Sequence, residues 1–368
     1  SSLSMISRLW VKELRNLKEC HLTFSPFKHC YIYGKNNQGK SSLLESLYLA
    51  IKAESPIQDD RSKVVQYDKE KAIVGVDIDS EEPLRVYCQL EESGKRALYI
   101  NNQKSRSFKA LNKHIFIDYI SADILHFFQK EAGFRRKQLD HYCAECFDGY
   151  DANLKQYEAV LKQKNRYLKQ ESVDAAVIDI YNKQMLEKGL PIVTQRLDAC
   201  RQLELKLHHC LKQLDIVSAD TVQMSYIKKR LESSTEADYA QKWQEQLNLD
   251  KEKERILGYS LTGPQRDDID VLLDEKSVSD FSSRGINRIV ALLFKLACIE
   301  SIREKNNVKC CLLLDDTLAE IDSDNKKKLF DYLLGYQQVV YATTEEKDFA
   351  YFSDACRYRI HEGEVTHV

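Results

Sequence analysis

Hydrophobic residues follow two different patterns along the chain. Toward both ends they gather in short aliphatic or β-branched runs bounded by turn residues, which is the pattern of β-strands. We expect strands at 32–34, 73–78, 84–90, 310–314 and 339–342. In the middle, from Tyr150 to Leu257, glycine and proline occur once each, at Gly189 and Pro191. Hydrophobic residues there recur at steps of three, four and seven, which predicts helices.

The helical middle is expected to consist of two long tracts joined by a turn at Gly189 and Pro191, with further helix after them. Its apolar seam comprises Leu154, Tyr157, Leu161 and Leu168 before that turn, and Val193, Leu197, Cys200, Leu207, Leu211 and Leu214 after it. Such a seam is typical of a short antiparallel helical arm. The most economical architecture is an α/β domain formed by residues 1–120 and 258–368, interrupted by a helical arm domain of residues 121–257.

Composition narrows the class of protein. The 368 residues are 43% hydrophobic and 30% charged, which excludes a disulfide mini-scaffold and a disordered chain. No stretch reaches the ~18 uncharged apolar residues that a membrane-spanning helix needs, so no membrane association is expected. The cysteines have no framework spacing and the first residues lack the pattern of a signal peptide, which favours the reducing cytoplasm. A net charge of -2 means that any nucleic-acid surface must be local.

A phosphate-binding loop follows the first predicted strand. Residues 34–42 read GKNNQGKSS and fit the pattern G-x-x-x-x-G-K-[ST], with a strand before them and a helical pattern after them. Backbone amides of such a loop surround phosphate oxygens, assisted by the positive end of the helix. We expect Lys40 to reach the β- and γ-phosphates of ATP and Ser41 to bind Mg²⁺. The nucleotide-binding residues predicted from this loop are Gly34, Lys35, Asn36, Asn37, Gln38, Gly39, Lys40, Ser41 and Ser42.

Two carboxylates end a buried strand in the last part of the chain. The strand 310–314 stays apolar until Asp315 and Asp316. Both side chains are therefore expected at the carboxyl edge of the sheet, where ligands of open α/β sheets bind. We expect Asp315 to hold Mg²⁺ through a water molecule and Asp316 to polarise the attacking water. Lys40 and Asp316 are the predicted catalytic residues.

A third segment, FSSRGINR, stands directly before a strongly helical run that starts at Ile289. Ser283 and Gly285 in this segment resemble the signature loop of ABC-type ATPases. In those enzymes the serine and the helix N-terminus bind the γ-phosphate of ATP on a neighbouring subunit. The resemblance implies that Ser283 and Gly285 contact ATP held by a second copy of the chain.

Together with further matches, these motifs resemble the RecF family, bacterial recombination mediator ATPases of the SMC-like ABC branch. The further matches are Arg15 and Asn16; Ser121, Leu125, Arg135, Arg136, Leu139 and Asp140; Tyr157, Leu161, Gln163, Asn165 and Leu168; Gly263, Pro264, Arg266, Asp267 and Asp268; and Asp322. They run in family order over nearly the whole chain, apart from about 171–250. The resemblance implies an α/β fold, namely an ABC-type P-loop ATPase head with an inserted α-helical arm domain. It also implies that Arg15 contacts ATP.

The chain departs from the RecF pattern at several positions. Asn37 replaces a glycine, Gln265 a histidine, Ile286 a glutamine and Ala319 a serine. Ile286 cannot donate a side-chain hydrogen bond, so the signature segment is expected to bind the ATP of the second copy more weakly. No switch histidine follows the strand 339–342, and Thr343 or Thr344 is expected to fill its place.

The resemblance implies a function in recombinational DNA repair. ATP would close two copies into a homodimer that clamps double-stranded or gapped DNA, including junctions of single and double strands, and helps to load RecA. RecR and RecO are the implied protein partners. Aspartate at 316, in place of the longer glutamate, predicts slow, DNA-stimulated ATP hydrolysis. Basic runs at 93–117 and 161–170 suit phosphate contacts, and the residues expected to bind DNA are Lys104, Arg106, Lys109, Lys162 and Arg166.

Two other functions stay open at this point. A scaffold of the same fold would bind ATP without releasing phosphate, and Ile286 is consistent with such a loss of hydrolysis. A small-molecule P-loop kinase would share the phosphate loop but has no use for the signature segment or the helical arm. Such a kinase would phosphorylate an acceptor and stay monomeric.

Overall fold

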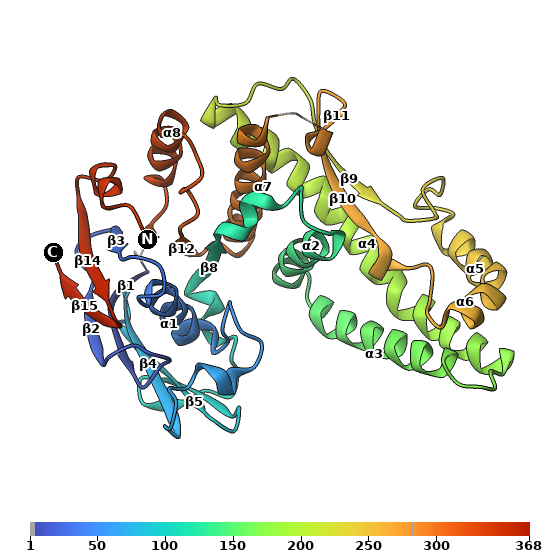
Figure 1. Cartoon of the computed structure of the whole chain (residues 1–368), viewed down its shortest axis with the longest axis horizontal. Coiled ribbons are helices and arrows are strands. Elements are labelled where there is room, and N and C mark those ends of the chain that lie inside the picture. The colour runs from blue at the N-terminus through green and yellow to red at the C-terminus, as the bar shows by residue number, and fades with distance from the viewer. Residues whose placement is uncertain (1–3, 281–282) are drawn as a thin grey trace. The chain divides into compact units, whose positions relative to one another are not determined.

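The computed structural model describes residues 4–280 and 283–368, which form two compact units (Figure 1). The first unit is Ser1–Leu125 with Arg303–Val368, and the second is His126–Ile302. The sequence prediction placed a domain boundary after residue 257. Residues 258–302 belong to the second unit, where β10 (Asp268–Leu273) pairs with β9 (Val222–Ile227).

Strands in the described part of the first unit form two sheets. The elements of this unit are β1 (Met5–Lys12), β2 (Cys20–Thr23), β3 (His29–Tyr33), α1 (Lys40–Lys52), β4 (Lys71–Asp79), β5 (Leu84–Glu91), β6 (Arg96–Ile100), β7 (Gln103–Lys104), β8 (Ile115–Ser121), β12 (Lys309–Asp315), α8 (Ser323–Leu333), β13 (Gln338–Thr343), β14 (Ala355–His361) and β15 (Glu364–His367). The antiparallel sheet has the order β2-β1-β4-β5-β6-β7, and the other sheet has the order β15-β14-β3-β13-β12-β8. Helix α1 packs against strands of both sheets (Figure 1).

The candidate site lies at one edge of the second of these sheets, where its parallel strands end. Strands β14, β3, β13, β12 and β8 run parallel, and Asp315 at the end of β12 pairs with Ala342 of β13 and Ser121 of β8. Almost every residue of β12 and β13 is buried, as expected for a parallel sheet covered on both faces. This burial explains their uninterrupted apolar runs. All five strands predicted from the sequence are confirmed, because they overlap β3, β4, β5, β12 and β13.

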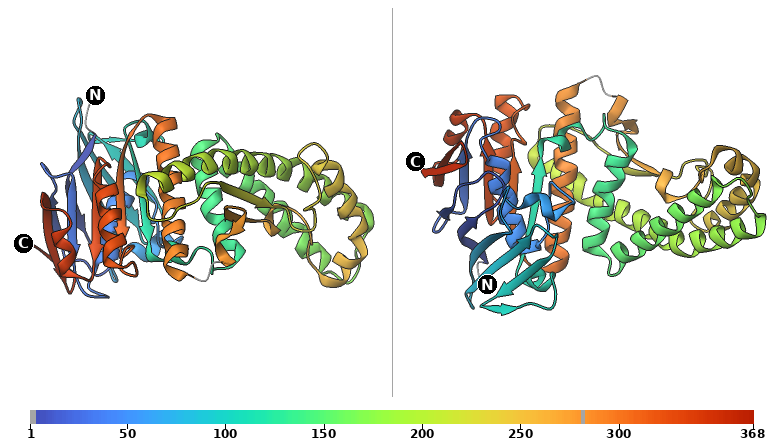
Figure 2. Two further views of the ribbon diagram at one scale, coloured as in Figure 1. Left: turned by 90° about the horizontal axis from the view of Figure 1, so that it is seen from above. Right: turned by 60° about the horizontal axis from the view of Figure 1, so that its bottom comes forward.

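The second unit contains the helical arm. Its elements are α2 (Ala132–Cys146), α3 (Tyr150–Leu168), α4 (Ala175–Leu214), β9, α5 (Tyr239–Leu249), α6 (Lys251–Leu257), β10, β11 (Lys276–Ser277) and α7 (Arg284–Asn306), whose last turn crosses the boundary between the units. Helices α3 and α4 lie side by side and antiparallel, as Figures 1 and 2 show. Asn153 near the start of α3 contacts Lys188 of α4, and the ring of Tyr167 near the end of α3 lies against that of Tyr181 in a tilted arrangement. No helix in the described residues of either unit has the length and apolar character needed to cross a membrane.

The prediction of a turn at Gly189 and Pro191 is wrong. Helix α4 runs without a break for 40 residues through both of them. The connection between α3 and α4 lies at 169–174 instead, and the side chain of Asp174 caps α4 by accepting a hydrogen bond from the amide of Ala176 at 2.9 Å. Gly189 has a packing role: an added Cβ would lie 2.5 Å from Cη2 of Trp243, which is fully buried against this part of the helix.

Replacing Gly189 by alanine is therefore expected to destabilise the second unit. Alanine favours a helix over glycine by about 1 kcal/mol. The displaced Trp243 ring costs about 1–3 kcal/mol, as overpacking of a filled core usually does. We expect a lower urea midpoint, measured by Trp243 fluorescence in a Trp10→Phe background. The matched control is Gly133→Ala in α2, where the nearest atom to an added Cβ is 3.6 Å away. Equal midpoints for the two variants would contradict the packing role of Gly189.

Candidate nucleotide-binding site

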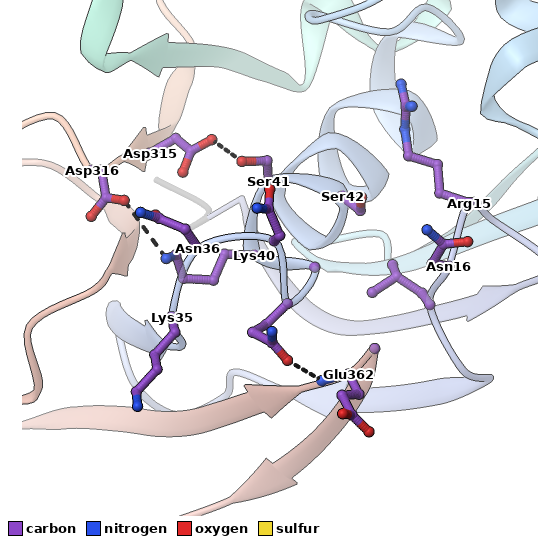
Figure 3. A pocket seen from close by; sticks show the side chains of 15 residues that line it. Arg15, Asn16, Lys35, Asn36, Lys40, Ser41, Ser42, Asp315, Asp316 and Glu362 are labelled. Carbon is purple, nitrogen blue, oxygen red and sulfur yellow. Dashed lines mark hydrogen bonds and ion pairs between the residues drawn. The ribbon is translucent and has the colours of Figure 1, made fainter.

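A cleft of about 870 Å³ opens at the carboxyl ends of β3 and β12 in the first unit. Four separate parts of the chain line it: 15–17 after β1, the loop and first helical turn 35–42, the strand end 315–316, and the turn 362–363 between β14 and β15 (Figure 3). Every predicted residue of the phosphate loop except Gly34 lines this cleft, and the predicted carboxylates face the same space. The structure thus brings together motifs that lie far apart in the sequence.

The backbone of the phosphate loop exposes amide groups. Asn37 has a φ of 64° and Gly39, directly before α1, has a φ of 113°. Asparagine adopts this left-handed conformation more readily than most residues, which explains how Asn37 replaces a glycine. No side chain caps the N-terminus of α1. The amides of its first turn therefore have no partner within the helix and are suited to bind an anion.

The turn between β14 and β15 holds the phosphate loop from one side. The amide of Glu362 donates to Oε1 of Gln38 at 2.6 Å, and the amide of Gly363 donates to the carbonyl of Gln38 at 3.0 Å. Gly363 has a φ of 77°, and an added Cβ would lie 2.2 Å from the carbonyl oxygen of Asn16. Only glycine fits this close approach. The turn and the segment after β1 therefore fix the position of the loop together.

Lys40 and Asp316 face each other in the cleft (Figure 3). Lys40 Nζ donates to the carbonyl oxygen of Gly34 at 2.5 Å and lies 3.6 Å from Oδ2 of Asp316. Burial lowers the pKa of Lys40 and raises the pKa of Asp316, and the attraction between the two opposes both shifts. The amide of Thr344 donates to Oδ1 of Asp316 at 3.0 Å, so Thr344 contacts the predicted catalytic carboxylate.

Ser41 and Asp315 lie in direct contact, and a third residue joins them. Ser41 Oγ donates to Oδ2 of Asp315 at 2.6 Å (Figure 3), and the hydroxyl of Tyr119 donates to the same oxygen. Burial, together with the charge of Asp315, raises the pKa of Tyr119, so this hydroxyl stays protonated.

The side chains at this point fit Mg²⁺. Hydroxyl and carboxylate oxygens are its preferred protein ligands, and the ion usually takes one or two of them and completes its shell with phosphate and water. Across residues 4–280 and 283–368 there is no group of three or more His, Cys, Asp or Glu side chains that could hold a metal ion. A metal ion at Ser41 and Asp315 would therefore depend on the phosphates of the nucleotide.

Arg15, which the resemblance places on ATP, lines the cleft but is engaged by Glu45. The guanidinium forms two hydrogen bonds with this carboxylate, at 2.5 and 2.9 Å, and points away from Lys40 in Figure 3. Glu45 is fully buried on α1 and also accepts a hydrogen bond from Ser55. This ion pair ties the segment after β1 to the helix that follows the phosphate loop.

The signature residues belong to the second unit. Ser283 and Gly285 are exposed at the start of α7. The amide of Ile286 donates to Oγ of Ser283 at 3.4 Å, so Ser283 stands in the position of a helix cap. Its neighbours Phe281 and Ser282 lie outside the described residues. Because the cleft is built in the first unit, Ser283 and Gly285 are not among the residues that line it.

The residues predicted to bind DNA fall in both units and are exposed. Lys104, Arg106 and Lys109 lie on β7 and the loop after it, whereas Lys162 and Arg166 line a groove on α3. Lys164, in the same basic run, is different. It is fully buried and forms an ion pair with Glu254 at 2.8 Å, so it has no part in a surface for phosphates.

Several of the remaining family residues converge inside the second unit. Arg135 of α2 forms two hydrogen bonds with Asp268, at 2.7 and 3.0 Å, and Arg136 donates to the carbonyl of Asp267. Burial raises the pKa of Asp267 to about 6. Arg196 joins Asp140 to the carbonyl of Pro264. These contacts hold α2, α4 and β10 together and serve the structure of this unit.

Tyr119 and Glu45 were missed in the reading of the sequence. Tyr119 lies in the run 115–121, whose aliphatic and aromatic residues are typical of a strand, although no strand was predicted there. Glu45 was missed because a carboxylate inside an apolar helix has no recognisable partner until Arg15 is placed beside it.

Comparisons with known proteins agree with this geometry. The family described as "AAA ATPase domain" matches residues 5–280. The DNA replication and repair protein RecF of Ligilactobacillus salivarius (strain UCC118) is 28% identical over 373 residues, covering 98% of this chain and 97% of the relative. The RecF protein of Carboxydothermus hydrogenoformans (strain ATCC BAA-161 / DSM 6008 / Z-2901) is 29% identical over 346 residues, covering 93% and 94%.

Solved structures show the same fold. The structure of the recombination mediator protein RecF-ATPrS in the RecFOR pathway has a TM-score of 0.85 at 24% identity and covers 99% of this chain and 98% of that one. A structure of the SmcHead bound to the C-winged helix domain of ScpA has a TM-score of 0.53 at 12% identity, covering 99% of this chain and 96% of that one. The resemblance to RecF and the ABC-type α/β fold with an inserted helical arm are thus confirmed.

Proposed function

We propose a function for this chain from the premise that it belongs to the AAA ATPase domain family and resembles RecF proteins along nearly its whole length. It acts as a recombination mediator ATPase in DNA repair and binds ATP in the cleft of the first unit. The observation that carries this proposal is the convergence of the phosphate loop, the Ser41–Asp315 pair and Asp316 at one edge of the parallel sheet.

The first unit supplies the groups for hydrolysis. Amides of the phosphate loop bind the phosphate oxygens, and Lys40 neutralises charge on the β- and γ-phosphates. Ser41 and Asp315 would hold Mg²⁺, which offsets the negative charge that develops during phosphoryl transfer. Asp316 orients the attacking water and accepts its proton. Aspartate reaches less far than glutamate, so it holds this water less closely and turnover is slow.

A second copy of the chain completes the site. All the residues that line the cleft belong to the first unit, and they leave part of the site without donors for the γ-phosphate in this proposal. Ser283 and the amides at the start of α7 of a second copy supply the missing donors. ATP thereby favours the homodimer, and hydrolysis releases it.

DNA is the proposed ligand of the ATP-bound homodimer. The exposed basic residues of β7, its following loop and α3 suit contacts with phosphates, which bind DNA without reading its sequence. RecR and RecO as partners, and the loading of RecA onto gapped DNA, are proposed because a similar structure is described as part of the RecFOR pathway.

The test combines light scattering with the binding of a fluorescent DNA duplex. We expect a monomer with ADP, a dimer with ATP, and tighter DNA binding in the ATP state. Reversing the charge of Lys162 and Arg166 to glutamate removes about two phosphate contacts. The slope of log affinity against log salt should fall by about 0.9 for each.

The control variant reverses Lys183 and Lys212, two exposed lysines of α4, and so carries the same net charge. A parallel variant at Lys104, Arg106 and Lys109 tests the surface of the first unit in the same way. If neither the molecular mass nor the DNA affinity changes with the nucleotide, the proposed ATP-dependent homodimer on DNA is contradicted. A dimer that forms with ATP but never releases phosphate would favour the scaffold.

A further inference from the structure

Tyr119 shares one oxygen of the Asp315 carboxylate with Ser41. The hydroxyl of Tyr119 and Oγ of Ser41 both donate to Oδ2 of Asp315. Within residues 4–280 and 283–368, no side chain or amide donates to Oδ1 of Asp315, which lines the cleft. One oxygen of this carboxylate is thus fixed by two hydroxyls, and the other stays available to the site.

The sheet explains why the tyrosine reaches this point. Strand β8 runs parallel to β12, with Tyr119 beside Leu313 and Ser121 beside Asp315. Tyr119 therefore starts two residues before the end of the strand, and its long side chain spans that distance to Asp315. The ring is partly buried against the core of the first unit, so its position is set by packing as well as by the hydrogen bond.

The contact with Asp315 also orients the hydroxyl group of Ser41. Because the proton of its hydroxyl points at Asp315, the lone pairs of Oγ are left for a cation in the cleft. The hydrogen bond from Tyr119 stops the carboxylate from rotating away and releasing that proton. Groups that hold the ligands of a metal in this way commonly change metal affinity by 10- to 100-fold when they are removed.

We propose that Tyr119 is a positioning residue for the divalent cation that accompanies the nucleotide, acting through Asp315 and Ser41. This inference rests on the proposed function, because it assumes that the cleft binds ATP with Mg²⁺. Tyr119 is not among the residues that line the cleft, so it acts on metal affinity and leaves the binding of the metal-free nucleotide unchanged.

The test measures metal binding directly in the Tyr119→Phe variant, which keeps the ring and removes the hydroxyl. Mn²⁺ is titrated into the full chain with a non-hydrolysable ATP analogue, and bound Mn²⁺ is measured by electron paramagnetic resonance. We expect affinity to fall by about tenfold. The control is Tyr99→Phe, at a half-buried tyrosine of β6 that stacks on Tyr87, and it should bind Mn²⁺ as the unaltered chain does. In a background of Asp315→Asn, Tyr119→Phe should have little further effect, because the two act through one contact.

The outcomes separate this inference from the proposed function. Unchanged Mn²⁺ affinity in Tyr119→Phe would overturn the positioning role. The role would also be overturned if Tyr119→Phe weakened the binding of fluorescent ADP in EDTA, where no metal is available, as much as it weakened Mn²⁺ binding. That result would mean that the tyrosine only supports the shape of the cleft. If the unaltered chain binds the ATP analogue but no Mn²⁺, the metal part of the proposed function fails, and the inference fails with it.

Discussion

Replacing Asp316 by asparagine should stop ATP hydrolysis while leaving ATP binding intact. A positioned general base contributes about 10²- to 10⁴-fold to a rate, so phosphate release should fall by at least 10². The amide oxygen of asparagine can still accept the hydrogen bond that Thr344 donates to Oδ1 at 3.0 Å, so the local structure should persist. The proposed function has hydrolysis release the homodimer, so the variant should accumulate as a dimer with ATP in light scattering.

Two further measurements sharpen this expectation. Asp324→Asn makes the same change of charge at an exposed position of α8 and should hydrolyse ATP normally.

Burial raises the pKa of Asp316, and its protonated form cannot act as a base. The activity of the unaltered chain should therefore decline with falling pH before exposed aspartates become protonated, and this acid limb should be missing from the residual activity of Asp316→Asn. Hydrolysis by Asp316→Asn at the normal rate would assign the role of base to another group.

The phosphate loop and the acidic strand end could be predicted because the residues that each of them needs are adjacent in the sequence. The loop needs glycine or asparagine at left-handed positions, a lysine and a hydroxyl directly before a helix, and all of these are local. Asp315 and Asp316 follow a strand whose burial is visible in its composition. That such strand ends meet at one edge is a general property of parallel sheets, so the approach of Ser41 to Asp315 follows from topology.

What could not be predicted depends on partners that are distant in the sequence. Gly189 reads as a helix breaker until Trp243, more than 50 residues later, is seen to fill the space above it. Lys164 reads as a surface charge until Glu254 is placed beside it. Tyr119 is an apolar strand residue by its neighbours, and only the pairing of β8 with β12 brings its hydroxyl to Asp315. In each case the contact that gives the residue its role is long-range, so the local pattern could not reveal it.

Replacing Ser283 by alanine should abolish the ATP-dependent homodimer without weakening ATP binding by the monomer. A hydrogen bond to a charged group contributes about 1.5–3 kcal/mol, and a symmetric dimer contains this contact twice. The dissociation constant of the dimer should therefore rise by roughly 10²- to 10⁴-fold. The cleft of each monomer is built without Ser283, so its affinity for fluorescent ATP should not change.

The proper control for Ser283 lies four residues earlier in the same stretch of chain. Ser279 is exposed and its hydroxyl is engaged by Ser277, so Ser279→Ala should dimerise with ATP as the unaltered chain does. Combining Ser283→Ala with Asp316→Asn removes hydrolysis as a cause of dissociation, so a monomer in this double variant reports the lost contact alone. A full dimer in the double variant would contradict the proposal that the γ-phosphate is bound by two molecules at once.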